Sequence, residues 1–149
     1  MKFLFVAQYG PITASSRTRV FDYLPFLEEN GVVVKVVVVV PDSLVWLSGG
    51  RHKMDRWFYY LRSFWRSFWV GWKCVWWARQ YDLLFIQKVL FPSFVARCLR
   101  FSRHKVIFDF DDAIFTTEVV GGDWITRLRN WRHRCGLPQM LRAACQAVV

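Results

Sequence analysis

The chain has 149 residues, the length of one ordinary domain, which excludes two lobes with a cleft between them inside this sequence. Its formal net charge of +10 indicates an anionic partner or surface, such as a phosphorylated substrate, acidic lipid headgroups or nucleic acid. The four cysteines form no C-x-x-C pair and the three histidines lie far apart. The sequence therefore predicts no metal site, no disulfide framework and reduced thiols in the cytoplasm.

The first part of the chain predicts a strand, a loop and a helix. Residues 2–7 form an apolar run that is shorter than the core of a signal sequence and is better interpreted as a strand. Two serines at 15–16 are favourable helix N-caps. Residues 17–30 have apolar positions three and four apart, and we expect one helix that kinks at Pro25 and ends at Gly31.

Three further apolar runs have the character of buried parallel strands. Residues 32–40 are almost continuous valine, which is β-branched, and residues 82–87 and 105–110 are two more apolar runs. Pro92 and a helical pattern over 94–101 separate the last two. Strands that alternate with helices in this way predict an α/β fold with a Rossmann-like parallel sheet and flanking helices.

The end of the chain predicts two helices and the start of a fifth strand. We expect one helix from Asp123 to Cys135, stopped by Gly136, and another with Pro138 in its first turn. Residues 144–149 resemble a helix end that enters a strand, and the sequence stops inside that strand. We therefore expect the chain to be a fragment of a longer protein.

The stretch from Ile107 to Phe115, I-F-D-F-D-D-A-I-F, contains the strongest signal for chemistry. Its apolar run ends in Asp109, Asp111 and Asp112, at the edge where open α/β sheets bind ligands. The alternation of a strand places the first two aspartates on one face, with the third in the following loop. The alternative is structural, with Asp109 bonding loop amides and Asp112 capping the next segment.

Three segments in order resemble the N-terminal lobe of glycosyltransferase family 4, which has the two-lobed GT-B fold. They run from Ala14 to Gly31, from Tyr81 to Pro92 and from Lys105 to Phe115. The resemblance implies that residues 1–149 form the acceptor-side lobe of a retaining glycosyltransferase. Such an enzyme transfers a sugar from a nucleotide-sugar to a lipid-linked or glycan acceptor, without a cofactor or catalytic metal. The fragment by itself is expected to be inactive, because the donor site lies mostly on the missing C-terminal lobe.

The resemblance also assigns roles to residues at the ends of the strands. Asp111 and Asp112 occupy the place of a polar pair that faces acceptor and donor sugar, and Asp111 is the stronger candidate for accepting the proton of an acceptor hydroxyl. The residues expected near the donor diphosphate are Gly10, Ser16, Arg17 and Arg19. Those expected to line the cleft are Gln87, Lys88 and Asp109. The structural alternatives are a capped helix with exposed arginines, and a loop that simply begins at Gln87.

A second enzyme class has a similar aspartate motif. The nucleophile motif of haloacid-dehalogenase-like phosphatases, D-x-D-x-T after an apolar run, is nearly matched by Asp109 to Ala113. Asp109 would then attack phosphorus and Asp111 would act as acid and base. Ala113 replaces the usual threonine, and the motif falls on a late strand. Glycosyl transfer is therefore the preferred prediction.

Residues 51–80 predict a basic helix rich in tryptophan. On a helical projection the cations form a stripe with tryptophans on its flank, as in helices that lie at a membrane surface. The residues assigned to that surface are Arg62, Trp65, Arg66, Trp69, Trp72, Lys73 and Trp76. Internal cations oppose a transmembrane span. We expect a peripheral protein on the anionic inner face of the cell membrane; the alternatives are a helix whose aromatic face covers the sheet, and a non-catalytic module that binds membranes or, less favourably, nucleic acid.

Overall fold

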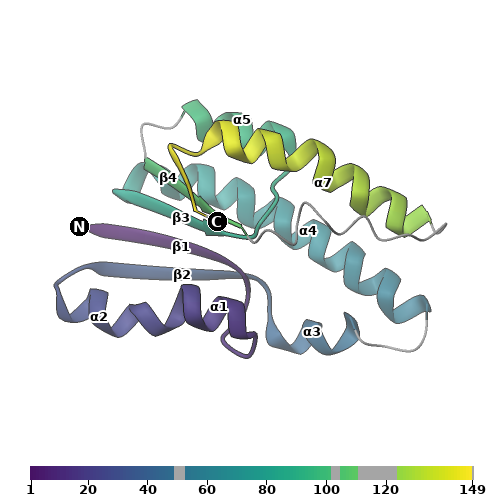
Figure 1. Cartoon of the computed structure of the whole chain (residues 1–149), viewed down its shortest axis with the longest axis horizontal. Coiled ribbons are helices and arrows are strands. Elements are labelled where there is room, and N and C mark those ends of the chain that lie inside the picture. The colour runs from purple at the N-terminus through teal and green to yellow at the C-terminus, as the bar shows by residue number, and fades with distance from the viewer. Residues whose placement is uncertain (49–52, 102–104, 111–123, 149) are drawn as a thin grey trace.

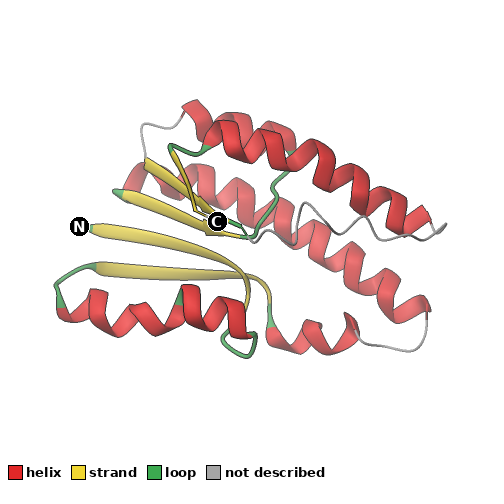
Figure 2. Cartoon of the chain, viewed as in Figure 1, coloured by secondary structure: helices red, strands yellow, loops and turns green. Residues whose placement is uncertain are grey.

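The computed structural model describes residues 1–48, 53–101, 105–110 and 124–148. It confirms an α/β fold with an all-parallel five-stranded sheet in the order β2-β1-β3-β4-β5 (Figures 1 and 2). The strands are β1 (Lys2–Tyr9), β2 (Val33–Val40), β3 (Leu83–Gln87), β4 (Lys105–Asp109) and β5 (Gln146–Val148). The α-helices are α1 (Ala14–Arg19), α2 (Leu24–Glu29), α3 (Asp42–Ser48), α4 (Lys53–Trp77), α5 (Ser93–Phe101) and α7 (Trp124–Ala143).

Helices cover the two faces of the sheet unequally. Alternate residues of β1 point to opposite sides, so Leu4 and Val6 join the larger core and Phe5 and Ala7 join the smaller one. The larger core lies under α4, α5 and α7, and the smaller core lies under α1 and α2, on the other side of the sheet (Figure 1). The sheet is thus the middle layer of three.

The strand order creates a topological switch point between β1 and β3. From β1 the chain moves outward to β2, and it then crosses back to add β3, β4 and β5 on the opposite side of β1. The connections that follow β1 and β3 therefore leave the sheet toward opposite faces. In open parallel sheets this is the position at which ligands bind, beyond the carboxyl ends of the strands.

The helix predicted over residues 17–30 is in fact two helices, so the expectation of one kinked helix was wrong. The break falls at Val20, where a 3₁₀ turn (Phe21–Tyr23) begins, and Pro25 lies in the first turn of α2. A proline in that position loses no hydrogen bond, because the first N–H groups of a helix have no intrahelical acceptor. The predicted stop is confirmed, since Gly31 has φ of 74° and its N–H donates to the Glu28 carbonyl at 3.0 Å.

The last helix also differs from the prediction. We expected Gly136 to separate two helices, but α7 continues through Gly136 and Pro138. A Cβ built at Gly136 would lie 3.5 Å from the Leu90 side chain, and Leu137 and Met140 are buried in the larger core. Packing of this face against the rest of the molecule outweighs the local preference for a break. The predicted fifth strand is confirmed as β5.

Small side chains let α4 approach the sheet and α5 closely. Ser63, Ser67, Gly71 and Cys74 are buried at three- and four-residue spacing, which places them on one side of the helix. The charged head of Arg66 reaches back to the edge strand, where its Nε donates to the Val39 carbonyl at 2.7 Å. The contact face of α4 therefore combines these small residues with the buried Tyr59 and Val70 of the larger core.

Candidate functional site at the carboxyl edge of the sheet

Two polar side chains lie next to each other at the carboxyl ends of β3 and β4. The strand register pairs Gln87 with Asp109 and Ala7 with Gln87. Residues paired in a parallel sheet point to the same face, and Ala7 belongs to the core beneath α1 and α2. Gln87 and Asp109 are 0% and 1% exposed. They therefore point toward α1 rather than toward the layer formed by α4, α5 and α7.

Ser16 of α1 contacts Gln87, the first of these two buried residues. Its hydroxyl donates to Gln87 Oε1 at 3.1 Å, and both side chains are buried. The serine predicted to cap the helix is thus inside it, while Thr13 takes the N-cap position. The Gln87 Nε2 group is buried and has no hydrogen-bond acceptor among the described residues. A buried amide donor of this kind is a position where an oxygen atom of another segment or of a ligand would be stabilised.

Arg19 of α1 contacts Asp109, the second of these two buried residues. Its Nη1 forms an ion pair with Asp109 Oδ1, which joins residues 90 positions apart in the chain. The Asp109 side chain is buried and that of Arg19 is about one-third exposed, at 34%. Because the buried carboxylate has a guanidinium against it, its charge is compensated where water is excluded. Arg17, predicted to act together with Arg19, is exposed on the surface of α1.

Lys88, the residue directly after β3, has an unusual backbone conformation. Its φ of 59° makes it the only residue other than glycine with positive φ in the described part of the chain. Its N–H donates to the Asp109 carbonyl at 2.8 Å, which fixes this turn against the end of β4. A left-handed lysine costs on the order of 1 kcal/mol or more, and such positions are concentrated at functional sites.

Gly10, at the end of β1, lies against an acidic residue that sequence reasoning missed. A Cβ at Gly10 would collide with the carboxylate of Asp42, the first residue of α3, so this glycine permits a close approach by Asp42. The only feature of the sequence that indicated a position for Asp42 at this edge is that it directly follows a predicted strand and Pro41. An anionic ligand that approached Gly10 would meet this carboxylate, which favours the arginine side of α1 for any diphosphate.

The structure thus brings together five of the predicted site residues and leaves others apart. Ser16 with Gln87, and Arg19 with Asp109 and the Lys88 turn, lie at one edge between α1 and strands β3 and β4. Gly10 is at the same edge but contacts Asp42 instead. The two aspartates predicted to be catalytic, Asp111 and Asp112, lie outside the described residues.

The outer face of α4 carries the tryptophans of the predicted membrane surface. They project within about 60° of one another at 100° per residue. Their exposed fractions are 53% for Trp65, 56% for Trp69, 53% for Trp72 and 68% for Trp76. The competing prediction, that this aromatic face covers the sheet, is wrong for these four side chains. Arg62 and Lys73 are exposed beside them, whereas Arg66 bonds to β2.

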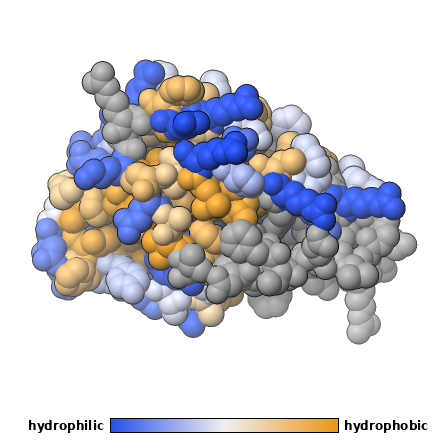
Figure 3. Space-filling model, turned by 45° about the horizontal axis from the view of Figure 1, so that its top comes forward, coloured by the Kyte–Doolittle hydropathy of each residue, from blue (hydrophilic) through white to orange (hydrophobic). Residues whose placement is uncertain are grey.

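Positive charge is concentrated in the layer formed by α4, α5 and α7. The sequences of these helices contain many arginines and lysines and a single acidic residue, Asp55. Hydrophilic and hydrophobic side chains lie next to one another on the side that holds α5 and α7 (Figure 3). Within the described ranges, no helix combines the length and the apolar character needed to cross a bilayer. The three-helix layer is therefore a cationic surface with exposed aromatic side chains.

The chain is a Rossmann-like parallel-sheet domain with a polar cluster at the carboxyl edge of the sheet, at its switch point. Comparison of the chain with protein-family models finds no matching family, and comparisons with curated proteins and with solved structures find no match. The described residues contain no group of three or more His, Cys, Asp or Glu side chains arranged to hold a metal ion.

Proposed function

We propose that this chain is the acceptor-side lobe of a retaining glycosyltransferase, which uses a nucleotide-sugar as donor and a lipid-linked or glycan acceptor. The observation that supports this most is the polar cluster at the switch point, where Ser16 and Arg19 of α1 meet Gln87 and Asp109 of β3 and β4. Ligands of parallel α/β sheets bind at this position. The resemblance of the surrounding segments to glycosyltransferase family 4 supplies the reaction class.

In this proposal the cluster positions the groups that meet the substrates. The Arg19 to Asp109 ion pair holds α1 against the end of β4, from which the chain continues toward Asp111 and Asp112. Asp111 accepts the proton of the attacking acceptor hydroxyl, and Asp112 orients the sugars. Exposed Arg17 and the Lys88 side chain supply positive charge for the donor diphosphate, while Ser16 and Gln87 fix the backbone that carries them.

The phosphatase alternative is weakened by the position of Asp109. A nucleophilic carboxylate has to reach the phosphorus of a bound substrate, but Asp109 is buried and paired with Arg19. The strand that carries it is also the fourth of the chain. We therefore expect no hydrolysis of phosphomonoesters, and Mg²⁺-dependent hydrolysis that is lost in Asp109→Asn would restore the phosphatase assignment.

Catalysis by Asp111 is tested in the protein encoded by the complete reading frame. Asp111→Asn is expected to lower kcat strongly while the KM for the nucleotide-sugar changes little, because the carboxylate acts on the acceptor after the donor has bound. Asp112→Asn is the matched variant, one residue away and with the same loss of charge. Unchanged turnover in a correctly folded Asp111→Asn enzyme would reassign this aspartate to a structural role.

We also propose that α4 attaches the protein to the anionic inner surface of the cell membrane. The supporting observation is a row of tryptophans, each more than half exposed, with two exposed cations beside it. The tryptophans are Trp65, Trp69, Trp72 and Trp76, and the cations are Arg62 and Lys73. Tryptophan is favoured at the boundary between lipid and water, and cations are attracted to acidic headgroups. This surface also favours a second candidate function, a membrane-binding module without catalysis, which the Asp111→Asn assay separates from the enzyme.

Sedimentation with vesicles tests the attachment. Arg62→Gln with Lys73→Gln is expected to weaken binding to anionic vesicles by about 2 kcal/mol, roughly 1 per charge, and to leave binding to neutral vesicles unchanged. Trp65→Ala with Trp69→Ala should weaken binding to both. Arg66 is left intact because it bonds to β2.

The control for these variants is Arg17→Gln with Lys105→Gln, which removes two exposed charges from other parts of the surface. Equal losses in the α4 and control variants would contradict a specific surface. Binding to single-stranded nucleic acid that exceeds binding to vesicles, and that depends on the same tryptophans, would assign the surface to nucleic acid instead.

A further inference from the structure

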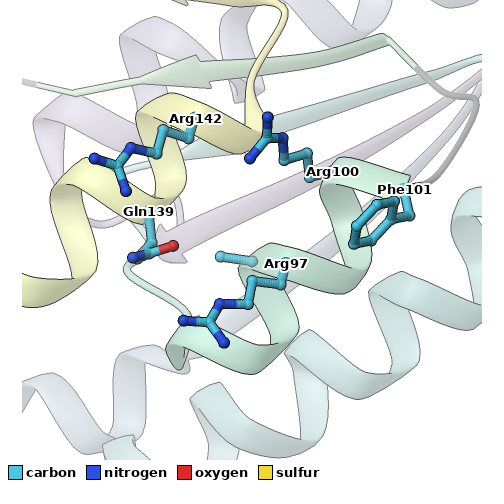
Figure 4. A pocket seen from close by; sticks show the side chains of 6 residues that line it. Arg97, Arg100, Phe101, Gln139 and Arg142 are labelled. Carbon is cyan, nitrogen blue, oxygen red and sulfur yellow. The ribbon is translucent and has the colours of Figure 1, made fainter.

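Three arginines line a groove between α5 and α7. It has a volume of about 200 Å³ and is lined by Ala96, Arg97, Arg100, Phe101, Gln139 and Arg142. Figure 4 shows Arg97, Arg100 and Phe101 projecting from α5, and Gln139 and Arg142 from α7. All three arginines are exposed, and Ala96 forms the buried floor.

The groove is separate from the polar cluster at the carboxyl edge. α5 runs from the carboxyl end of β3 to the amino end of β4, so its last turns lie at the opposite edge of the sheet. α7 ends beside it, just before β5. The arginines therefore take no part in the proposed glycosyl-transfer site, and the inference drawn from them does not rest on that function.

Among the residues that the structure describes, the arginines have no acidic neighbour that would explain their positions. No acidic residue lines the groove, and within the described chain none of the three forms an ion pair. Arg97 and Arg100 are three residues apart on one helix, a spacing at which like charges destabilise the helix. The partial negative charge at the carboxyl end of a helix favours Arg100 and Arg142, which lie in the last turns of α5 and α7. Arg97 lies outside the last turn of α5 and gains nothing from this charge.

The chemistry of the lining matches a phosphate group. Guanidinium groups donate paired hydrogen bonds to phosphate oxygens, and the Gln139 amide adds a further donor. The volume is below the roughly 300 to 1,000 Å³ of pockets for drug-sized molecules, which suits a small anion or a single headgroup. Phe101, which is 85% exposed, places an aromatic ring at the rim.

We propose that the groove between α5 and α7 is a binding site for a phosphate group, held by Arg97, Arg100 and Arg142. Two sources supply this chemistry, the phosphomonoester headgroup of a lipid and a soluble phosphorylated molecule. The lipid source would add a specific contact to the general attraction of the three-helix layer. The soluble source would make the groove a binding site for a small phosphorylated molecule.

Titration with inorganic phosphate at constant ionic strength tests the site in the full chain. The wild-type chain is expected to bind phosphate saturably and more tightly than chloride. Arg97→Gln with Arg142→Gln removes one arginine from each wall and is expected to weaken binding by about tenfold per arginine. Arg97→Lys with Arg142→Lys keeps the charge but removes the planar guanidinium. Its phosphate affinity should lie between those of the wild type and the Gln variant.

The matched control is Arg79→Gln with Arg127→Gln, which removes two exposed charges outside the groove. It is expected to bind phosphate as the wild type does. All the changed side chains are exposed, so the variants should fold, and equal melting temperatures check this. Equal weakening in the groove and control variants, or no saturable binding by the wild type, would overturn the proposal.

Vesicles distinguish the two sources. Phosphatidic acid exposes a phosphomonoester, whereas phosphatidylglycerol carries only a diester. If the groove variant loses affinity for phosphatidic acid vesicles but not for phosphatidylglycerol vesicles of equal surface charge, the ligand is a lipid headgroup. If it loses affinity for inorganic phosphate alone, the ligand is soluble. A loss that is the same for both lipids, without any change in phosphate binding, would contradict a phosphate site.

Discussion

Removing Arg19 should destabilise the fold more than removing its partner. Arg19→Met leaves the Asp109 carboxylate buried without its guanidinium, since that side chain is only 2% exposed. Breaking a fully buried pair in this way costs about 3 to 5 kcal/mol. The Arg19 side chain is 34% exposed, and screening by water reduces the expected cost to about 3 kcal/mol. Asp109→Asn should cost about 1 kcal/mol, because the arginine left behind can turn toward solvent.

Thermal and urea denaturation, followed by circular dichroism, measure these costs. For a chain of this size the losses correspond to about 6 to 12 °C for Arg19→Met and about 2 to 4 °C for Asp109→Asn. The double variant should cost less than the sum of the two single variants, because the interaction can be lost only once. Arg17→Met is the control, an exposed arginine two positions away whose loss should stay within about 0.5 kcal/mol. Equal costs for Arg17→Met and Arg19→Met, or a larger cost for Asp109→Asn than for Arg19→Met, would refute the reasoning.

Two further predictions concern the packing of α4. Gly71→Ala should destabilise the fold by about 1 to 2 kcal/mol despite the better helix propensity of alanine, because the new Cβ would lie 2.8 Å from Phe91 Cδ1 and 3.0 Å from Val95 Cγ1. A raised urea midpoint in that variant would contradict this packing. Burial raises the pKa of the Cys74 thiol from 9.0 to about 12. The unfolded chain releases this proton near pH 9 and the folded chain retains it, so the free energy of unfolding should fall between pH 9 and 12, by at most about 1.4 kcal/mol per pH unit. Urea midpoints at pH 8 and 11 should differ less in Cys74→Ala than in the wild type, and an equal difference would argue against the burial of this thiol.

The fold was largely predictable because each strand carries a local signal. The valine-rich run at 32–40 and the apolar runs at 82–87 and 105–110 became β2, β3 and β4 with ends within one residue of the expectation. The helix boundaries failed where tertiary packing decides them. Pro138 predicts a new helix when only local sequence is considered, yet buried Leu137 and Met140 hold it inside α7.

The candidate site was only partly predictable, for a different reason. Serine, arginine, glutamine and aspartate at the ends of strands indicated the edge where chemistry is expected. Which of them meet depends on strand order and register, and these join Ser16 to Gln87 across 71 residues and Arg19 to Asp109 across 90. The same holds for the groove, whose arginines belong to helices that are separated in sequence by β4 and the segment that follows it.

The nucleotide sequence that follows the codon for Val149 in the intact gene is the most direct test of the proposed enzyme. If the chain is the acceptor-side lobe of a family 4 glycosyltransferase, the reading frame should continue without interruption into a second Rossmann-like lobe. The resemblance predicts two glutamates about eight residues apart in that lobe. A native stop codon directly after Val149 would contradict the assignment.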